Sequence, residues 1–238
     1  CFLMLRVICG VLTACVLVVA LFNVANDNWE FVLRNPSSLD MVFIQGGEFL
    51  MGSDNPEAYP QDGEGPVRKV SVGSFYVQPT EVTNEMFSEF IEKTHYVTDA
   101  EKFGWSFVLE TFLSDEQNRL ATSAVEGSPW WVQVFGAKWN TPEGPDSDIG
   151  NRANHPVTHV SYNDASAYCK FYNARLPTEE EWEYAARGGL EQKNYPWGDH
   201  RMGENRQHLA NIFQGEFPYL NSELDGYKGT APVGSFPP

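Results

Sequence analysis

The chain has 238 residues, of which 42% are hydrophobic and 14% aromatic, so it is long enough for one domain with a sizeable core. Its 32 acidic residues against 16 lysines and arginines give a net charge of −16 at pH 7. This balance argues against binding to nucleic acid or to an anionic membrane surface, since both require a basic patch.

Residues 1–25 have the form of a signal sequence. Arg6 precedes an uncharged, mostly apolar run from Val7 to Phe22, and small residues follow up to Ala25. The run is slightly shorter than the ~20 residues that span a bilayer, which favours a cleaved signal peptide over an uncleaved signal anchor. Either form directs the domain into the secretory pathway, and only the anchor would hold it at a membrane. Residues 26–40 are predicted to be a polar linker.

The predicted domain occupies residues 41–238 and begins with strands. Residues 41–51 predict a strand, a turn at Gly46-Gly47 and a return strand, and residues 67–77 add further short strands. A helix follows the predicted cap Thr83, and its apolar side consists of Phe87, Phe90 and Ile91. A helix after hairpins, with long loops later, favours an α+β fold.

Residues 100–139 are rich in aromatic side chains and lack a clear period, apart from a predicted helix over residues 114–124. The aromatic residues are Phe103, Trp105, Phe107, Phe112, Trp130, Trp131, Phe135 and Trp139. We interpret them as core residues beneath loops. The alternative is a peptide-binding groove, because rigid aromatic rings give contact area at low entropic cost.

His155 and His159 would share one face of a helix and could there bind zinc. Pro156 and the β-branched residues that follow it favour an extended strand instead, and no glutamate follows His155. We therefore predict that both histidines make structural hydrogen bonds.

Residues 161–189 predict two short helices with their capping residues. Ser161 with Asp164, and Thr178 with Glu181, each form a capping pair at a helix start. Gly188 ends the second helix. The positions expected to face inward are Ala165, Tyr168, Cys169 and Tyr172 in the first helix, and Trp182, Ala185 and Ala186 in the second.

The carboxyl-terminal residues contain one pattern with possible metal ligands. Asn221-x-Glu223-x-Asp225-Gly226 is similar to the start of a helix-loop-helix calcium loop. Pro232 stands at the twelfth position, where that loop requires a glutamate. From the residues alone, an ordinary turn is the favoured interpretation.

Several of these motifs occur together in a known family. The string Arg-Leu-Pro-Thr-Glu-Glu-Glu-Trp-Glu-Tyr-Ala-Ala-Arg-Gly-Gly at residues 175–189 resembles a signature of the formylglycine-generating enzyme (sulfatase-modifying factor) family. So do the segments at residues 41–52, 155–165 and 195–198. The resemblance runs from about Met41 to Pro238 in the order expected for the family.

The resemblance implies a fold and a reaction. The fold would be compact and related to C-type lectins, with little regular secondary structure. The reaction would be the oxidation of the cysteine in a Cys-x-Pro-x-Arg segment of nascent sulfatases to formylglycine, in the lumen of the endoplasmic reticulum. The enzyme uses molecular oxygen and copper(I) bound by two cysteines, and soft thiolates suit that ion.

The two copper-binding cysteines of the family lie in a carboxyl-terminal segment, after an Asn-x-Trp-Glu-Trp motif. The sequence ends at Pro238 before any such motif. We therefore expect a chain truncated at its carboxyl end, without the catalytic residues, and inactive as it stands. By the same resemblance, Cys169 would form a disulfide with the missing segment.

The resemblance also assigns residues to sites. A structural calcium ion would be held by the side chains of Asn211 and Asp225 and by the carbonyl groups of Ile212 and Tyr227. The groove for the sulfatase peptide would be lined by the residues Trp130 and Ser106, with Trp105 beside it.

Two departures from the family pattern leave the activity of the whole protein open. Trp105 stands where some active members have an acid, and Ala186 stands where some animal enzymes have a cysteine. Both features resemble the inactive sulfatase-modifying factor 2 paralogues. The leading hypothesis is a formylglycine-generating oxidase. One alternative is a non-catalytic paralogue that binds sulfatases or forms a homo- or heterodimer with a family member. Another is a different oxidase or a lectin-like member of the superfamily.

Overall fold

The computed structural model describes residues 39–56 and 58–237, so the predicted signal segment and most of the linker lie outside the described residues. Residues Met41–Pro238 form one compact unit. Among the described residues, no helix is long and apolar enough to cross a membrane. The unit combines short helices with small antiparallel sheets, as the α+β prediction expected, and much of it is turns and loops.

Two paired segments form an interrupted antiparallel ribbon. Strand β1 (Val42–Ile44) pairs with β4 (Phe75–Val77), and β2 (Gly47–Met51) pairs with β3 (Arg68–Val72). The strands were predicted correctly, but the hairpin predicted between β1 and β2 is wrong. A Cβ atom on Gly46 would lie 2.5 Å from the backbone of residues 72–74. Gly46 therefore lets two backbones approach closely while the chain continues without reversing.

A three-stranded sheet carries the aromatic-rich segment. Its order is β5 (Trp105–Leu109), β7 (Ser128–Phe135) and β6 (Ala124–Val125), all antiparallel. The short helix η2 (Glu110–Phe112) and α4 (Asp115–Leu120) connect β5 to β6. The helix predicted over residues 114–124 therefore ends early, because its last residues pair with β7. One side of the sheet is buried through Val108, Val132, Val134 and Ala137.

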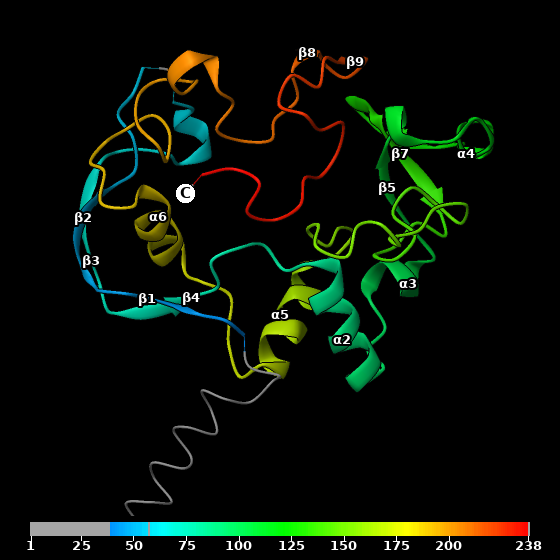
Figure 1. Ribbon diagram of the computed structural model, residues 1–238, viewed down its shortest axis with the longest axis horizontal. Coiled ribbons are helices and arrows are strands. Elements are labelled where there is room, and N and C mark those ends of the chain that lie inside the picture. Colours follow the sequence, from blue (N-terminus) through cyan, green and yellow to red (C-terminus); the bar gives the residue numbers. More distant parts are fainter. Residues whose placement is uncertain (1–38, 57, 238) are drawn as a thin grey trace, which may run out of the picture. The chain divides into compact units, whose positions relative to one another are not determined.

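Three helices begin at the capping residues that the sequence predicted, and a fourth begins at a capping box that was not recognised. Helix α2 (Asn84–Thr94) is capped by Thr83, α5 (Tyr162–Phe171) by the Ser161–Asp164 box, and α6 (Glu179–Arg187) by the Thr178–Glu181 box. Helix α3 (Asp99–Phe103) was not predicted, although its Thr98–Glu101 capping box was readable in the sequence. Helices α2 and α5 lie side by side (Figure 1), and Phe87 stacks on Tyr168 with ring centroids 6.0 Å apart.

The remaining elements are one short helix between β2 and β3 and three elements after α6. They are the short helices η1 (Pro60–Asp62) and η3 (Glu204–Arg206) and the hairpin of β8 (Gly215–Glu216) with β9 (Leu220–Asn221).

Helix α6 presents a different face to the protein than the sequence predicted. Trp182 is 65% exposed, whereas Ala185 and Ala186 are half-buried. The helix packs on β2 and β3 through Tyr184, whose ring lies 5.2 Å from that of Phe49 and whose hydroxyl donates to a backbone carbonyl at 3.1 Å. The inward assignment of Trp182 is therefore wrong.

The aromatic residues of the β5–β7 region divide between core and surface. Trp139 is buried at 6% exposure. Phe103, Phe107, Trp131 and Phe135 are exposed, so their assignment to a core beneath loops is wrong. Alternation along the strands explains this result, because the paired residues Phe107 and Gln133 lie on the side opposite to the valine cluster.

A buried carboxylate joins three elements of the fold. Asp164 in the first turn of α5 is fully buried and accepts hydrogen bonds from the Ser161 backbone N–H at 2.8 Å, the Tyr96 hydroxyl at 3.0 Å and the Asp99 backbone N–H at 3.0 Å. Ser161 Oγ in turn donates to Asp99 Oδ2 at 2.6 Å, and this bond lowers the pKa of Asp99. The cluster fixes the start of α3, and α3 leads directly into β5.

We predict that Asp164→Asn lowers the free energy of unfolding by about 2–3 kcal/mol, because one acceptor oxygen becomes an amide donor that faces other donors. Urea denaturation at pH 7 measures the change. The matched control is Asp115→Asn in the exposed first turn of α4, which should stay within about 0.5 kcal/mol of the parent protein. Equal effects of the two substitutions would contradict the role given to Asp164.

A second prediction concerns Glu181, which receives two hydrogen bonds of 2.7 Å from the Arg175 guanidinium. This pairing lowers the pKa of Glu181 from 4.5 to about 2. A carboxyl group whose pKa is lowered by folding stabilises the folded state at pH values above its pKa in the unfolded chain. That stabilisation disappears as the pH falls through the lowered pKa of the folded state. Glu181→Gln should therefore lower the urea midpoint at pH 7 and have progressively less effect between pH 4.5 and about 2. A difference that is constant with pH would exclude this account.

Candidate functional site

Ser106 on β5 is held by a half-buried histidine. Its Oγ lies 2.8 Å from Nδ1 of His159, which sits on the extended segment before α5. His159 has a φ of 57°, a left-handed conformation that is uncommon outside glycine, so the backbone turns here to aim the ring at β5.

The hydrogen bonds of His159 define its protonation. Burial lowers its pKa, while a hydrogen bond to the backbone of Pro142 and the charge of Glu143 oppose that shift. The imidazole is therefore neutral at pH 7. Proline offers only a carbonyl acceptor, so the other ring nitrogen carries the proton and donates to Pro142. Nδ1 must then accept from the Ser106 hydroxyl, which leaves the Ser106 oxygen as an acceptor for a further donor.

The two histidines singled out in the sequence both bind hydroxyl groups. His155 Nδ1 lies 2.9 Å from Oγ1 of Thr230, just as His159 meets Ser106. The segment between them is extended and pairs with Thr83 through a single β-bridge at Pro156. The prediction of structural hydrogen bonds at both histidines is confirmed.

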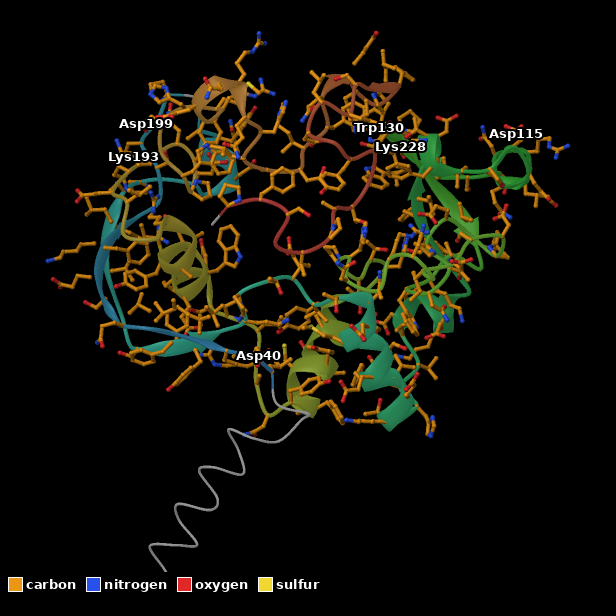
Figure 2. The ribbon with its side chains drawn as sticks, viewed as in Figure 1. Asp40, Asp115, Trp130, Lys193, Asp199 and Lys228 are labelled. Atoms are coloured by element: carbon orange, nitrogen blue, oxygen red, sulfur yellow. The ribbon has the colours of Figure 1, made fainter. Side chains whose placement is uncertain are left out.

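The structure separates the three residues predicted to line a peptide groove. Ser106 pairs with Val134, so it shares the valine side of the sheet with Trp130, which lies four residues away along β7. Trp105 pairs with Phe135 and lies on the opposite side. Trp130 lies near the start of β7 (Figure 2). Its ring meets Phe217 of the β8–β9 hairpin edge-on, with ring centroids 5.3 Å apart. Trp130 and Ser106 thus mark the two ends of one sheet face, and Trp105 belongs to the other.

A cavity of about 490 Å³ lies beside β5 and next to His159. Its apolar wall comes from residues 107–109 with Phe112 and Trp131, and its polar wall from His159, Glu143 and Arg152. This volume is typical of ligand pockets, which measure roughly 300–1,000 Å³. Of the predicted groove residues none lines the cavity directly, but Ser106 supports its His159 wall.

The charged residues of this cavity were not predicted from the sequence. The Arg152 guanidinium donates to both carboxylate oxygens of Glu143, at 2.6 and 2.8 Å, and the Lys228 ammonium lies 5.8 Å from the centroid of the Phe112 ring. Glu143 and Arg152 are nine residues apart in irregular segments, so no helix or strand period could pair them. A proline- and glycine-containing loop around residues 142–146 was the sole signal in the sequence.

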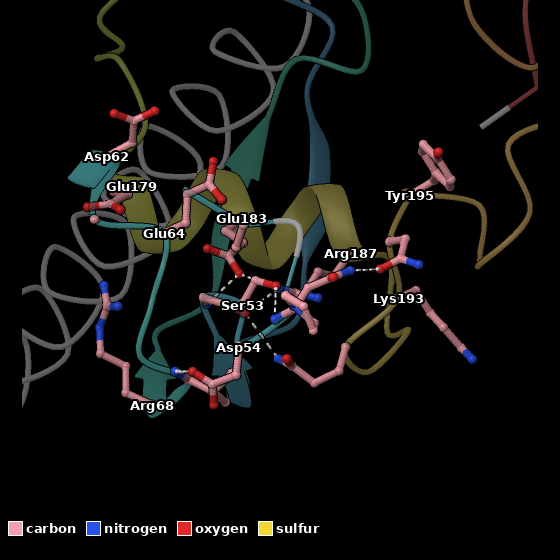
Figure 3. Close-up of a pocket in the computed structure, with 18 of the residues that line it drawn as sticks. Ser53, Asp54, Asp62, Glu64, Arg68, Glu179, Glu183, Arg187, Lys193 and Tyr195 are labelled. Atoms are coloured by element: carbon pink, nitrogen blue, oxygen red, sulfur yellow. Dashed lines mark hydrogen bonds and ion pairs between the residues drawn. The ribbon is translucent and has the colours of Figure 1, made fainter. Parts of the chain in front are cut away.

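Another pocket, of about 1110 Å³, lies between α6 and the loop after β2 (Figure 3). Two of its charged side chains, both on α6, bind each other and the backbone of that loop: Glu183 Oε1 accepts from Gly52 N at 2.8 Å and from Arg187 Nη2 at 2.6 Å, and Arg187 also donates to Gly52 O at 3.0 Å. Asp54 Oδ1 accepts from Val67 N at 3.1 Å. These bonds tie the loop to α6, so we interpret the pocket as structural.

The four residues predicted to bind calcium lie together in the structure. Asp225 accepts from the backbone N–H of Ile212 at 3.0 Å and from that of Tyr227 at 3.1 Å, so one carboxylate joins both segments. Asn211 donates its amide N–H to Gly229 O at 2.8 Å, which leaves its amide oxygen as an acceptor.

The donor set of this loop fits calcium. One carboxylate, one amide oxygen and two backbone carbonyls are hard oxygen ligands, and calcium takes six to eight such ligands, with water completing the shell. The described part of the chain has no cluster of three or more His, Cys, Asp or Glu side chains, so any ion here depends on amide and carbonyl oxygens.

The described residues do not fit copper(I). That ion prefers a pair of thiolates, and Cys169, a half-buried residue on α5, is the single cysteine of residues 39–56 and 58–237. Burial raises the pKa of its thiol, which keeps it protonated at pH 7. The disulfide predicted for Cys169 stays a prediction.

Comparison with known proteins gives consistent matches along the folded unit. Residues 31–238 match the model of the sulfatase-modifying factor enzyme 1-like domain. The chain is 52% identical to the mouse formylglycine-generating enzyme over 83% of its length, which covers 53% of that enzyme. It is 50% identical to the Thermomonospora curvata formylglycine-generating enzyme over 89% of the chain and 70% of that enzyme.

Two further matches bear on activity and fold. The chain is 48% identical to the bovine inactive C-alpha-formylglycine-generating enzyme 2, over 87% of the chain and 66% of that protein. Among solved structures, PvdO from Pseudomonas aeruginosa matches with a TM-score of 0.54 at 22% identity, over 85% of this chain and 65% of that one, which supports the fold alone.

The chain spans about half the length of the mouse and bovine formylglycine-generating enzymes that it matches. The family model covers most of the chain, and the identity to relatives from mammals and bacteria is close to one half over more than four fifths of it. The chain belongs to the formylglycine-generating enzyme (sulfatase-modifying factor) family.

Proposed function

We propose that the whole protein oxidises the cysteine of a Cys-x-Pro-x-Arg segment in nascent sulfatases to formylglycine, with molecular oxygen as the oxidant. The observation that carries this proposal is the 52% identity to the mouse formylglycine-generating enzyme across the folded unit. The net charge of −16 also favours encounter with a peptide that carries an arginine.

In this proposal, the described residues bind and orient the peptide. Ser106 offers an oxygen that accepts a hydrogen bond, because its own proton is held by His159. Trp130 offers a half-buried ring that Phe217 keeps in place. A copper(I) ion would supply the activation of oxygen, and its thiolate ligands are not among these residues. We propose that the reaction takes place in the lumen of the endoplasmic reticulum, on the basis of the signal-like residues 1–25.

A second candidate function is that of a non-catalytic paralogue that binds sulfatases or an active family member. Trp105 and Ala186 favour it, since both resemble the inactive paralogues, as does the 48% identity to the inactive bovine protein. Peptide binding without turnover would distinguish this function from the oxidase.

The whole protein, supplied with copper and oxygen, should convert a Cys-x-Pro-x-Arg peptide to an aldehyde that mass spectrometry detects. Trp130→Ala should raise the KM by about tenfold, the order expected from loss of ~1.4 kcal/mol of ring contact with the peptide. The control is Trp182→Ala, which removes an exposed tryptophan on α6 and should leave the KM unchanged. If the cysteine of the peptide remains a thiol after incubation with the parent protein, the oxidase is excluded. Peptide binding that still depends on Trp130 would then identify the non-catalytic paralogue.

We also propose a structural calcium ion at Asn211, Ile212, Asp225 and Tyr227. The support is that the segments of Ile212 and Tyr227 are both hydrogen-bonded to the Asp225 carboxylate, that Asn211 adjoins Ile212, and that the set consists of hard oxygen ligands.

Titration calorimetry of the chelated, folded protein should detect one calcium ion, and a hundredfold excess over Kd should add about 2.7 kcal/mol of stability. Asp225→Asn should weaken binding at least tenfold because it removes the one charged ligand. The matched control is Glu223→Gln in the same loop. It removes one negative charge, as Asp225→Asn does, but from an exposed side chain outside the ligand set, so this variant should bind calcium as the parent protein does. Absence of calcium binding to the folded parent protein would refute the assignment.

A further inference from the structure

A cationic pocket of about 470 Å³ lies between the loop around η3 and the segment that precedes the β8–β9 hairpin. Its charged lining consists of Arg201 and Arg206, with His208 beside them, and no carboxylate lines it. In a chain with twice as many acidic as basic residues, such a local reversal of sign is unexpected. It places two positive charges together in the lining of one pocket of a protein whose net charge is −16.

The two arginines stand apart from the ion pairs of the fold. Among the described residues, each salt bridge involves other cations, and neither Arg201 nor Arg206 has a carboxylate within ion-pair distance. Asn205 and Arg206 both have positive φ, at 56° and 65°. Two successive left-handed residues turn the chain sharply and place the Arg206 side chain on the pocket wall. Guanidinium groups without a partner are suited to bind an oxyanion in a bidentate manner.

A buried amide fixes the orientation of the histidine. Gln214 is 8% exposed, and its Oε1 accepts from the Asp225 backbone N–H at 3.1 Å. Its Nε2 must therefore donate to Nδ1 of His208, which lies 3.1 Å away. In the neutral imidazole the proton is then on Nε2, so His208 retains one N–H donor for a ligand in the pocket that it lines.

Part of the pocket lining is apolar and open to water. Ile212 is 42% exposed and Leu224 is 71% exposed, and both line the pocket together with Met202. Covering these side chains removes apolar surface from water, which favours a ligand that has an apolar part. The pocket is larger than a bare inorganic oxyanion needs. Its volume falls within the range of pockets that bind small organic ligands, roughly 300–1,000 Å³.

We propose that this pocket binds a small organic anion, in which one carboxylate or sulfonate-type oxyanion group is joined to an apolar body of a few carbon atoms. The oxyanion lies between the Arg201 and Arg206 guanidinium groups and accepts from His208, and the apolar body covers Ile212 and Leu224. The site is independent of the proposed oxidation, because none of its lining residues belongs to the predicted peptide groove.

The test uses the full chain with methyl-labelled Ile, Leu and Met, at a fixed calcium concentration, and follows the methyl signals of Ile212, Leu224 and Met202 by NMR. Four probes separate the contributions: hexanesulfonate, hexanoate, neutral 1-hexanol, and methanesulfonate without an apolar body. Hexanesulfonate or hexanoate should shift these three signals with saturation, and both 1-hexanol and methanesulfonate should bind at least tenfold more weakly. The better of the two six-carbon anions identifies the preferred oxyanion.

The double substitution Arg201→Gln and Arg206→Gln should weaken binding of the preferred anion at least tenfold and leave the weak binding of 1-hexanol unchanged. The matched control is Arg119→Gln on α4, an exposed arginine that donates only to a backbone carbonyl of its own helix and should bind as the parent does. The same spectra report whether each variant is folded. Equal affinity for hexanesulfonate and 1-hexanol, or an unchanged affinity in the folded double variant, would overturn the proposal.

Discussion

The fold of this chain depends on one buried carboxylate. Asp164 closes the first turn of α5, and it also accepts from the residue that opens α3 and from Tyr96, which follows α2. A carboxylate without exposure to water is tolerated only when several donors satisfy it. These bonds therefore set the spacing of α2, α3 and α5. Because β5 begins just after α3, the same carboxylate fixes where Ser106 meets His159.

Local patterns in the sequence predicted the ends of elements better than their partners. The capping boxes at Ser161 and Thr178 are satisfied within three residues, so their chemistry is readable without knowledge of the fold. Strand pairing is a long-range property. The chain does not reverse at Gly46, because that residue lies against the backbone of residues 72–74, and nothing in the local sequence indicates this contact. Trp182 was misplaced for the same reason, since the packed face of α6 is chosen by β2 and β3.

The candidate site shows a similar division. The resemblance to a known family led to Ser106, Trp130 and the four predicted calcium ligands, and in the structure the backbone N–H groups of two of these ligands, Ile212 and Tyr227, donate to the carboxylate of a third, Asp225. It also places Trp105 and Ser106 on opposite sides of the sheet, because they are consecutive residues of β5. The Glu143–Arg152 pair and the cationic pocket near Arg206 arise from irregular loops. Loops of this kind have no periodic pattern, so the sequence does not indicate which of their side chains lie close together, and only the structure shows it.

The central claim is that the sulfatase peptide contacts the half-buried side chains of Ser106 and Trp130, which lie at the two ends of the valine face of the sheet. Hydrogen–deuterium exchange of the whole protein, with and without a Cys-x-Pro-x-Arg peptide, tests it most directly. The account predicts slower exchange in residues 105–109 and 128–135 on addition of the peptide, with no change in α6. Protection confined to α6 and the pocket beside it, or no protection under conditions where the peptide is bound, would contradict the account.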